Sequence, residues 1–191
     1  MSDTAPIRAI HLPSYPWNPY QRLLAAAVTE AGVEATAVHE WPQRTAILGA
    51  WLQQGRPEVI HLHWLHEFLG GSKGRPTGRN VRWLDWQLRV LKAAGVRLVW
   101  TVHNLKGHAA SGEDPNDVAA HRMMIERADA IILHCEYARE ALTEMYGVGA
   151  EAQAKMHVLP HGSYVRQYDV DLDQAASRRA LGLSEAGTVF A

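Results

Sequence analysis

The segment GVRLVWTVHN, residues 95–104, carries the clearest strand signal in this chain. It opens on Gly95, a residue type that ends helices in the left-handed conformation, and continues into an apolar run over residues 97–102. A short apolar run of this kind is typical of a strand buried on both faces of a parallel sheet. Because the run ends in His103 and Asn104, it predicts a buried strand with polar side chains at its carboxyl end.

The same order of strand, helix and glycine recurs on both sides of this stretch. Apolar runs predict strands over residues 7–12, 35–39, 59–63, 97–102, 130–134 and 156–159. Apolar periodicity predicts helices over residues 19–31, 44–54, 81–94 and 136–146, and another that begins at Asp114-Pro115. Gly32, Gly55, Gly95 and Gly147 follow four of the predicted helices. This alternation predicts an α/β fold, a Rossmann-like doubly wound parallel sheet of about six strands flanked by helices.

We expect one such domain over residues 1–165, followed over residues 166–191 by a polar linker and the start of a further domain that is missing. The linker has one short helical stretch, residues 177–183, and an apolar run begins at Thr188. Residues 70–80, GGSKGRPTGRN, predict a mobile basic loop.

The composition excludes several functional classes. Hydrophobic residues make up 47% of the 191 residues, and the net charge of −1 gives no global attraction to nucleic acid or to a membrane surface. The single cysteine, Cys135, favours a reducing compartment. With neither a recognisable signal peptide nor an apolar run of about 20 residues, we expect a cytoplasmic protein with at most peripheral contact to the inner face of a membrane.

Polar and aromatic side chains follow almost every predicted strand. Ligands of open parallel sheets bind outside the carboxyl ends of the strands, so these side chains predict a site at that rim. Tyr15, Trp17 and Trp64 suit the flat faces of sugars, whereas Trp51, Trp83 and Trp86 are expected to fill the core. The candidate residues are His11, Ser14, Tyr15, Trp17, Asn18, His61, His63, Trp64, His66, His103, Asn104, Lys106, His134, His161, Gly162 and Ser163.

Three alternatives for this rim remain open at this point. His61, His63 and His66, with Glu67 nearby, resemble the histidine pairs of zinc hydrolases, although the usual carboxylate spacing is absent and we expect no metal. Cys135 stands where a strand enters a helix, but a small buried thiol is the better interpretation than a nucleophile. Helix amino termini at Asn18 and after Ser163 suit anions, yet no GxGxxG or GxxxxGK[ST] motif is present, which argues against a dehydrogenase or a P-loop enzyme.

The segments NPYQRLL, PEVIHLHW, RLVWTVHNLKGH, ADAIILHCEYAREAL and MHVLPHGSYV occur in this order along the chain. Together they resemble the amino-terminal half of bacterial retaining glycosyltransferases of family 4, which have the two-domain GT-B fold. The resemblance covers residues 7–170 approximately and implies the strand order 2-1-3-4-5-6. It also implies that this half mainly recognises the acceptor.

The resemblance assigns roles to individual residues. His103 faces the substrate cleft as the catalytic candidate and Asn104 accompanies it, His61 and His63 lie on the neighbouring strand, and His161-Gly162 lies near the donor. Pro13 to Asn18 replaces the Gly-Gly loop that approaches the donor phosphates in many members, so contact with the donor is in doubt there.

The expected partners are a nucleotide-sugar donor, a glycan or lipid-linked acceptor, and a donor-binding domain or a separate chain, with no nucleic acid and no cofactor. Lys73, Arg75, Arg79 and Lys106 are candidates for an acceptor diphosphate or for lipid headgroups, although a solvated loop is the simpler interpretation. A non-catalytic module that binds sugars or nucleotides together with a second chain is the alternative function.

Overall fold

A computed structural model describes residues 5–39, 46–70, 76–106, 114–168, 173–184 and 187–188 of the 191-residue chain. The chain divides into two compact units, Met1–His161 and Gly162–Ala191. The larger unit holds the sheet. In the smaller unit, α8 (Gln174–Ala180) begins at Asp173, whose carboxylate accepts hydrogen bonds from two amides of the first turn. Assignment of residues 166–191 to a linker and a further domain stays a prediction.

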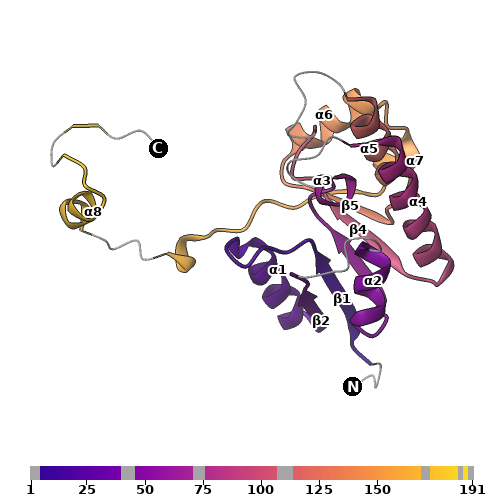
Figure 1. Cartoon of the computed structure of the whole chain (residues 1–191), viewed down its shortest axis with the longest axis horizontal. Coiled ribbons are helices and arrows are strands. Elements are labelled where there is room, and N and C mark those ends of the chain that lie inside the picture. Colours follow the sequence, from indigo (N-terminus) through magenta and orange to yellow (C-terminus); the bar gives the residue numbers. More distant parts are fainter. Residues whose placement is uncertain are drawn as a thin grey trace. The chain divides into compact units, whose positions relative to one another are not determined.

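The larger unit contains one six-stranded parallel sheet in the order β2-β1-β3-β4-β5-β6 (Figure 1). This arrangement confirms both the predicted fold class and the strand order that the resemblance implied. The strands are β1 (Ile7–Leu12), β2 (Val33–Ala37), β3 (Val59–Leu62), β4 (Arg97–Thr101), β5 (Ala130–Leu133) and β6 (Met156–Val158). The helices of this unit are α1 (Pro19–Glu30), α2 (Ala46–Gln53), α3 (His66–Leu69), α4 (Gly78–Ala93), α5 (Pro115–Arg127), α6 (Glu136–Tyr146) and α7 (Ala150–Gln153).

Local sequence accounts for the helix boundaries. Asn18 accepts a hydrogen bond from the Tyr20 amide and begins α1, and Asp114 does the same for α5 at the Asn116 amide. All four predicted glycines have positive φ, including Gly147 directly after α6 at φ 64°. Because L-residues avoid this conformation, these positions end each helix and turn the chain back toward the sheet.

The predictions differ from the structure at several places. β2 begins and ends two residues before the predicted range, because Val33 and Glu34 already pair with Ile7 and Arg8 of β1. Within the predicted loop 70–80, α4 already begins at Gly78, where Thr77 caps it; residues 71–75 lie outside the described residues. In the smaller unit α8 begins before residue 177, and most of the apolar run that starts at Thr188 lies outside the described residues.

The two faces of the sheet have different chemistry. One face carries fully buried apolar side chains in register across β1, β3, β4 and β5, and the Trp100 ring on this face contacts His121 of α5 at 5.7 Å. The other face carries histidines, and the Tyr20 ring of α1 contacts His63 there at 5.6 Å. Figure 1 shows α1 on one side of the sheet and α2 and α4 on the other. The apolar face consists of Ile10, Leu12, Ile60, Leu62, Leu98, Trp100, Ile131 and Leu133.

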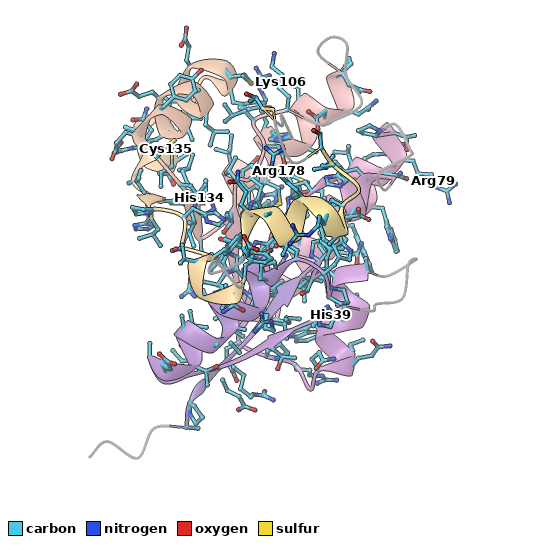
Figure 2. All side chains as sticks on the ribbon, turned by 90° about the vertical axis from the view of Figure 1, so that its left-hand side faces the viewer. His39, Arg79, Lys106, His134, Cys135 and Arg178 are labelled. Carbon is cyan, nitrogen blue, oxygen red and sulfur yellow. The ribbon has the colours of Figure 1, made fainter. Side chains whose placement is uncertain are left out.

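Two expectations about burial are wrong. Trp83 and Trp86 do not fill the core: they are 44% and 45% exposed on α4, and their rings stack on each other at 4.7 Å. Trp51, in contrast, packs against the core and donates its indole N–H to the Pro57 carbonyl. Cys135 is exposed rather than buried, next to His134 at the start of α6 (Figure 2). None of the helices in the described residues is long and apolar enough to cross a membrane.

The carboxyl end of α5 is held by one lysine. Lys155 Nζ donates hydrogen bonds to the carbonyls of Ile125, Glu126 and Ala128 at 3.2, 3.1 and 3.1 Å. These carbonyls have no partner within the helix ladder, and a cation there also interacts favourably with the helix dipole. Lys155 precedes β6 and therefore joins the end of α5 to the edge of the sheet.

Replacing Lys155 by Met keeps the length of the side chain and removes the charge. We expect Lys155→Met to lower the free energy of unfolding by about 1–2 kcal/mol, since it leaves three carbonyls without their donor. Urea denaturation followed by circular dichroism measures the change. Arg122→Met, which removes a positive charge from the exposed side of the same helix, is the control and should change stability by less than about 0.5 kcal/mol. An equal loss in both variants would contradict the capping role.

Candidate functional site at the carboxyl ends of the strands

His103 lies at the centre of the candidate site, two residues beyond the end of β4. Its ring stacks on Trp64 at 4.4 Å with an interplanar angle of 18°. Its Nε2 shares a hydrogen bond of 3.1 Å with Nδ1 of His63, and the edge of the Tyr20 ring contacts it at 4.9 Å. His103 is thus fixed from three sides, with Nδ1 as the ring nitrogen that the His63 hydrogen bond leaves for other contacts.

Burial keeps His103 and the buried histidines His11, His61 and His63 neutral at physiological pH. Burial lowers the pKa of His103 to about 3, and the nearby rings of His134 and His161 lower it further. Burial also lowers the pKa of His11 to about 4 and holds the pKa values of His61 and His63 well below their ordinary range. A neutral imidazole donates one hydrogen bond and accepts another, so this group can recognise hydroxyls without carrying charge.

Tyr20 connects the histidines of β3, β4 and β5. Besides His63 and His103, its ring contacts His134 at 5.7 Å and His161 at 5.2 Å. His134 donates from Nδ1 to the Leu159 carbonyl at 3.0 Å, which leaves Nε2 to meet the Tyr20 hydroxyl at 3.4 Å. Tyr20 was not among the predicted site residues; its place two residues after the helix cap Asn18 is the signal that points to it.

Three aromatic side chains extend the site on the side of β1. Tyr15 stacks on Trp17 at 4.9 Å and contacts Trp64 at 5.2 Å, and Trp17 is 76% exposed. Tyr15 donates its hydroxyl to Glu67 Oε1 at 2.7 Å, which fixes its ring. Burial and the Glu67 carboxylate raise the pKa of Tyr15 above its ordinary value. The three predicted aromatic residues therefore lie together, and Glu67 is a supporting residue that the prediction placed only in a metal site.

A pocket of about 320 Å³, partly open to solvent, borders His103. Six of the candidate residues line it, together with residues of α5. Asp117 and His121, one turn apart on α5, were missed by the sequence analysis. His121 donates from Nδ1 to the Asp117 backbone carbonyl at 2.9 Å and stacks on the Tyr146 ring. The lining residues are His63, Trp64, Leu65, His66, Trp100, His103, Asn104, Lys106, Asp117 and His121.

A second pocket, of about 400 Å³, lies beside the first and shares Lys106 and Asp117 with it. Asp114, Arg122 and Tyr146 also line it. Lys106 is exposed between the two pockets (Figure 2), where an ammonium group can meet an anionic group of a ligand.

Several predicted site residues have other partners or lie in the smaller unit. Ser14 is buried, and its backbone amide donates to the Val38 carbonyl. Asn18 is half-buried, and its side chain caps α1. His66 leaves the histidine group and pairs with Glu67 at 3.3 Å. Gly162 and Ser163 are exposed and belong to the smaller unit.

The predicted basic residues are not brought to the rim as a group. Arg79 is exposed on α4, whereas Lys73 and Arg75 lie outside the described residues. Within the part of the chain that the structure describes, Lys106 is the one lysine or arginine that lines the pocket at His103.

Comparison with known protein families agrees with this site. A sequence model of glycosyltransferase family 4 matches residues 11–164, which is most of the chain, so the protein belongs to this family. The matched segment begins at His11 and includes every strand end of the rim. The comparison with curated proteins finds no match.

The pair Tyr15–Glu67 generates a prediction about stability and pH. We expect Tyr15→Phe to lower the free energy of unfolding by about 1 kcal/mol, because the carboxylate loses a donor. The folded-state pKa of Tyr15 is raised, so the unfolded chain ionises first, near pH 10. The stabilisation is therefore complete below about pH 10 and is lost as the pH rises toward the folded pKa.

Urea denaturation of both proteins between pH 7 and pH 11 measures this difference. Since every other tyrosine is common to the two proteins, the Phe variant is its own control. A difference that grows above pH 10 would contradict the proposed sign.

Proposed function

We propose that this chain is the acceptor-binding half of a retaining glycosyltransferase with the two-domain GT-B fold. The full reaction moves a sugar from a nucleoside-diphosphate sugar to a glycan or lipid-linked acceptor, in polysaccharide or glycolipid synthesis. The observation that carries the proposal is the neutral His103, stacked on Trp64 and bonded to His63 beside an open pocket. Membership of family 4 supports the reaction class.

The proposed role of His103 is to hydrogen-bond a hydroxyl of the reacting sugar or of the acceptor. Its pKa, lowered to about 3, keeps it uncharged, so it positions a hydroxyl and does not act as a cation. His63 is buried beneath it, so we propose that His63 positions His103 rather than contacting a substrate. Asn104 and Lys106 provide an amide and an ammonium group at the same pocket.

Tyr15, Trp17 and Trp64 form the proposed sugar platform. The Tyr15 ring lies 4.9 Å from Trp17 and 5.2 Å from Trp64, and the Trp17 ring is exposed. Aromatic faces stack on the apolar faces of sugars, while the tyrosine hydroxyl and indole N–H are polar handles. This surface suits an acceptor glycan better than a free phosphate.

The charge of the pocket supports the proposal that this chain binds the acceptor and that another domain or chain binds the donor. Of the described residues that line it, Lys106 alone carries a fixed positive charge, and Asp117 carries a negative one. Stabilising a departing diphosphate needs several cationic or amide donors. We therefore propose that the donor diphosphate is bound by a second domain or chain, at or near the cytoplasmic face of a membrane.

Acceptor binding tests the proposal directly. We expect oligosaccharides to bind the chain and Trp64→Ala to weaken that binding at least tenfold, which corresponds to about 1.4 kcal/mol. Titration calorimetry with short oligosaccharides, and separately with UDP-glucose and GDP-mannose, measures the two ligand classes. Trp83→Ala, which removes an exposed tryptophan of α4, is the matched control and should bind like the parent protein. Tight nucleotide-sugar binding without glycan binding would overturn the proposal in favour of a nucleotide-binding module.

An assay of sugar transfer by the 191-residue chain separately tests whether the donor site lies outside it. We expect no sugar transfer above background when nucleotide sugar and acceptor are supplied together, because this pocket has too few donors for the diphosphate. Product analysis by mass spectrometry measures transfer. Robust transfer by this chain alone would show that the donor site lies within it.

A further inference from the structure

Three histidine rings meet beneath the rim, on the face of the sheet that α1 covers. His11 of β1 lies opposite His61 of β3 in the parallel register, and His63 follows β3 on the same face. The ring centroids are 4.9 Å apart for His11 and His61, 5.9 Å for His11 and His63, and 4.3 Å for His61 and His63. One nitrogen from each ring lies within 4.8 Å of the other two.

This cluster holds buried polar atoms that have no hydrogen-bond partner. The three side chains are 2%, 5% and 1% exposed in the order His11, His61, His63. Both ring nitrogens of His11 and Nε2 of His63 are buried without a partner. The remaining atom of this kind among the described residues is Oε1 of Gln21, on α1. Each such atom costs about 1–3 kcal/mol unless something binds it, so their concentration at one place calls for a ligand.

The other ring nitrogens of the cluster already have partners. His61 Nε2 shares a hydrogen bond of 2.8 Å with Thr101 Oγ1, and His63 Nδ1 shares one of 3.1 Å with His103 Nε2. Each bond fixes the ring and leaves its second nitrogen, Nδ1 of His61 and Nε2 of His63. Metal-binding histidines have this arrangement: one ring nitrogen donates a hydrogen bond to a neighbouring group, and the other ring nitrogen coordinates the metal.

We propose that His11, His61 and His63 form a binding site for a divalent transition metal ion of the Zn²⁺ type. The three imidazoles supply three ligands, and water occupies a fourth, open position. The site differs from the His61, His63 and His66 set considered from the sequence, because His66 pairs with Glu67 and His11 of the neighbouring strand takes its place. Metal binding at this site does not require the proposed glycosyl transfer, although His63 shares a hydrogen bond with His103.

The donor set decides the class of metal. Imidazole nitrogen suits Zn²⁺, Cu²⁺ and Ni²⁺, whereas Ca²⁺ and Mg²⁺ require oxygen ligands that this cluster does not supply among its described residues. Three nitrogens bound to zinc at about 2.0–2.1 Å are about 3.3 Å apart in tetrahedral geometry. The rings therefore have to move closer than the spacing of up to 4.8 Å in this structure when the ion binds.

Metal titration of the chain tests the proposal. The protein is purified without a metal-chelate column, stripped with chelator and titrated with Zn²⁺ or Co²⁺. We expect one buried equivalent with a dissociation constant below about 1 µM, a rise in the thermal midpoint, and for Co²⁺ the intense visible absorption of a four-coordinate ion.

Variants assign the binding to the cluster. His11→Leu should lose at least 100-fold in affinity, while its metal-free form stays folded, because leucine replaces two unsatisfied nitrogens with apolar surface. His157→Gln changes an exposed histidine of β6 and should bind the metal like the parent protein. Equal affinity of the His11 variant and the parent would overturn the proposal, as would an equal loss in the His157 variant.

X-ray absorption spectroscopy of the zinc-loaded parent protein identifies the metal ligands directly. It therefore tests the proposal even if the His11 variant does not fold. We expect three imidazole nitrogens at about 2.0 Å in the first shell. Six oxygen ligands, or binding of no more than weakly held surface zinc, would show that the cluster holds water alone and would overturn the proposal.

Discussion

The alternation of side chains along three neighbouring parallel strands is the constraint on which the rest of this structure depends. In β1, β3 and β4 alternate residues enter the apolar core, namely Ile10, Leu12, Ile60, Leu62, Leu98 and Trp100, and the residues between them face α1. Because the strands are parallel and in register, those intermediate positions come together at the carboxyl ends. His11, His61, His63, Thr101 and His103 thus become one connected group although they come from distant parts of the sequence.

Burial on this face determines what the group can do chemically. A solvated histidine titrates near neutral pH, but here the cost of burying an imidazolium keeps the rings uncharged. The rim therefore offers hydrogen-bond donors, acceptors and aromatic faces, with little net charge. Such a surface is suited to hydroxyl-rich, uncharged ligands. A diphosphate-binding surface, in contrast, needs cationic side chains.

The sequence predicted the sheet better than it predicted the site. Apolar runs and positive-φ glycines located all six strands, since a parallel sheet demands buried segments and sharp helix ends at each crossover. The exposure of Trp83 and Trp86 was missed, because residue type says nothing about which side of α4 faces solvent at those two positions. Pairing across strands, such as His11 with His61, depends on register, and Tyr20 depends on where α1 crosses the rim. Neither can be obtained from a pattern local to one segment.

His63 links the two proposals, and its two ring nitrogens allow one consequence to be worked out. A metal ion on Nε2 requires the proton of His63 to reside on Nδ1, which then donates to Nε2 of His103. His103 must accept that bond, so its own proton resides on Nδ1 and its free nitrogen is a hydrogen-bond donor. The buried cluster would therefore select which atoms of a substrate His103 can recognise, namely the lone pairs of a hydroxyl or ring oxygen. The tautomer of His63 below the rim then fixes the tautomer of His103 at the rim. The two residues are coupled because both lie on the polar face of the sheet.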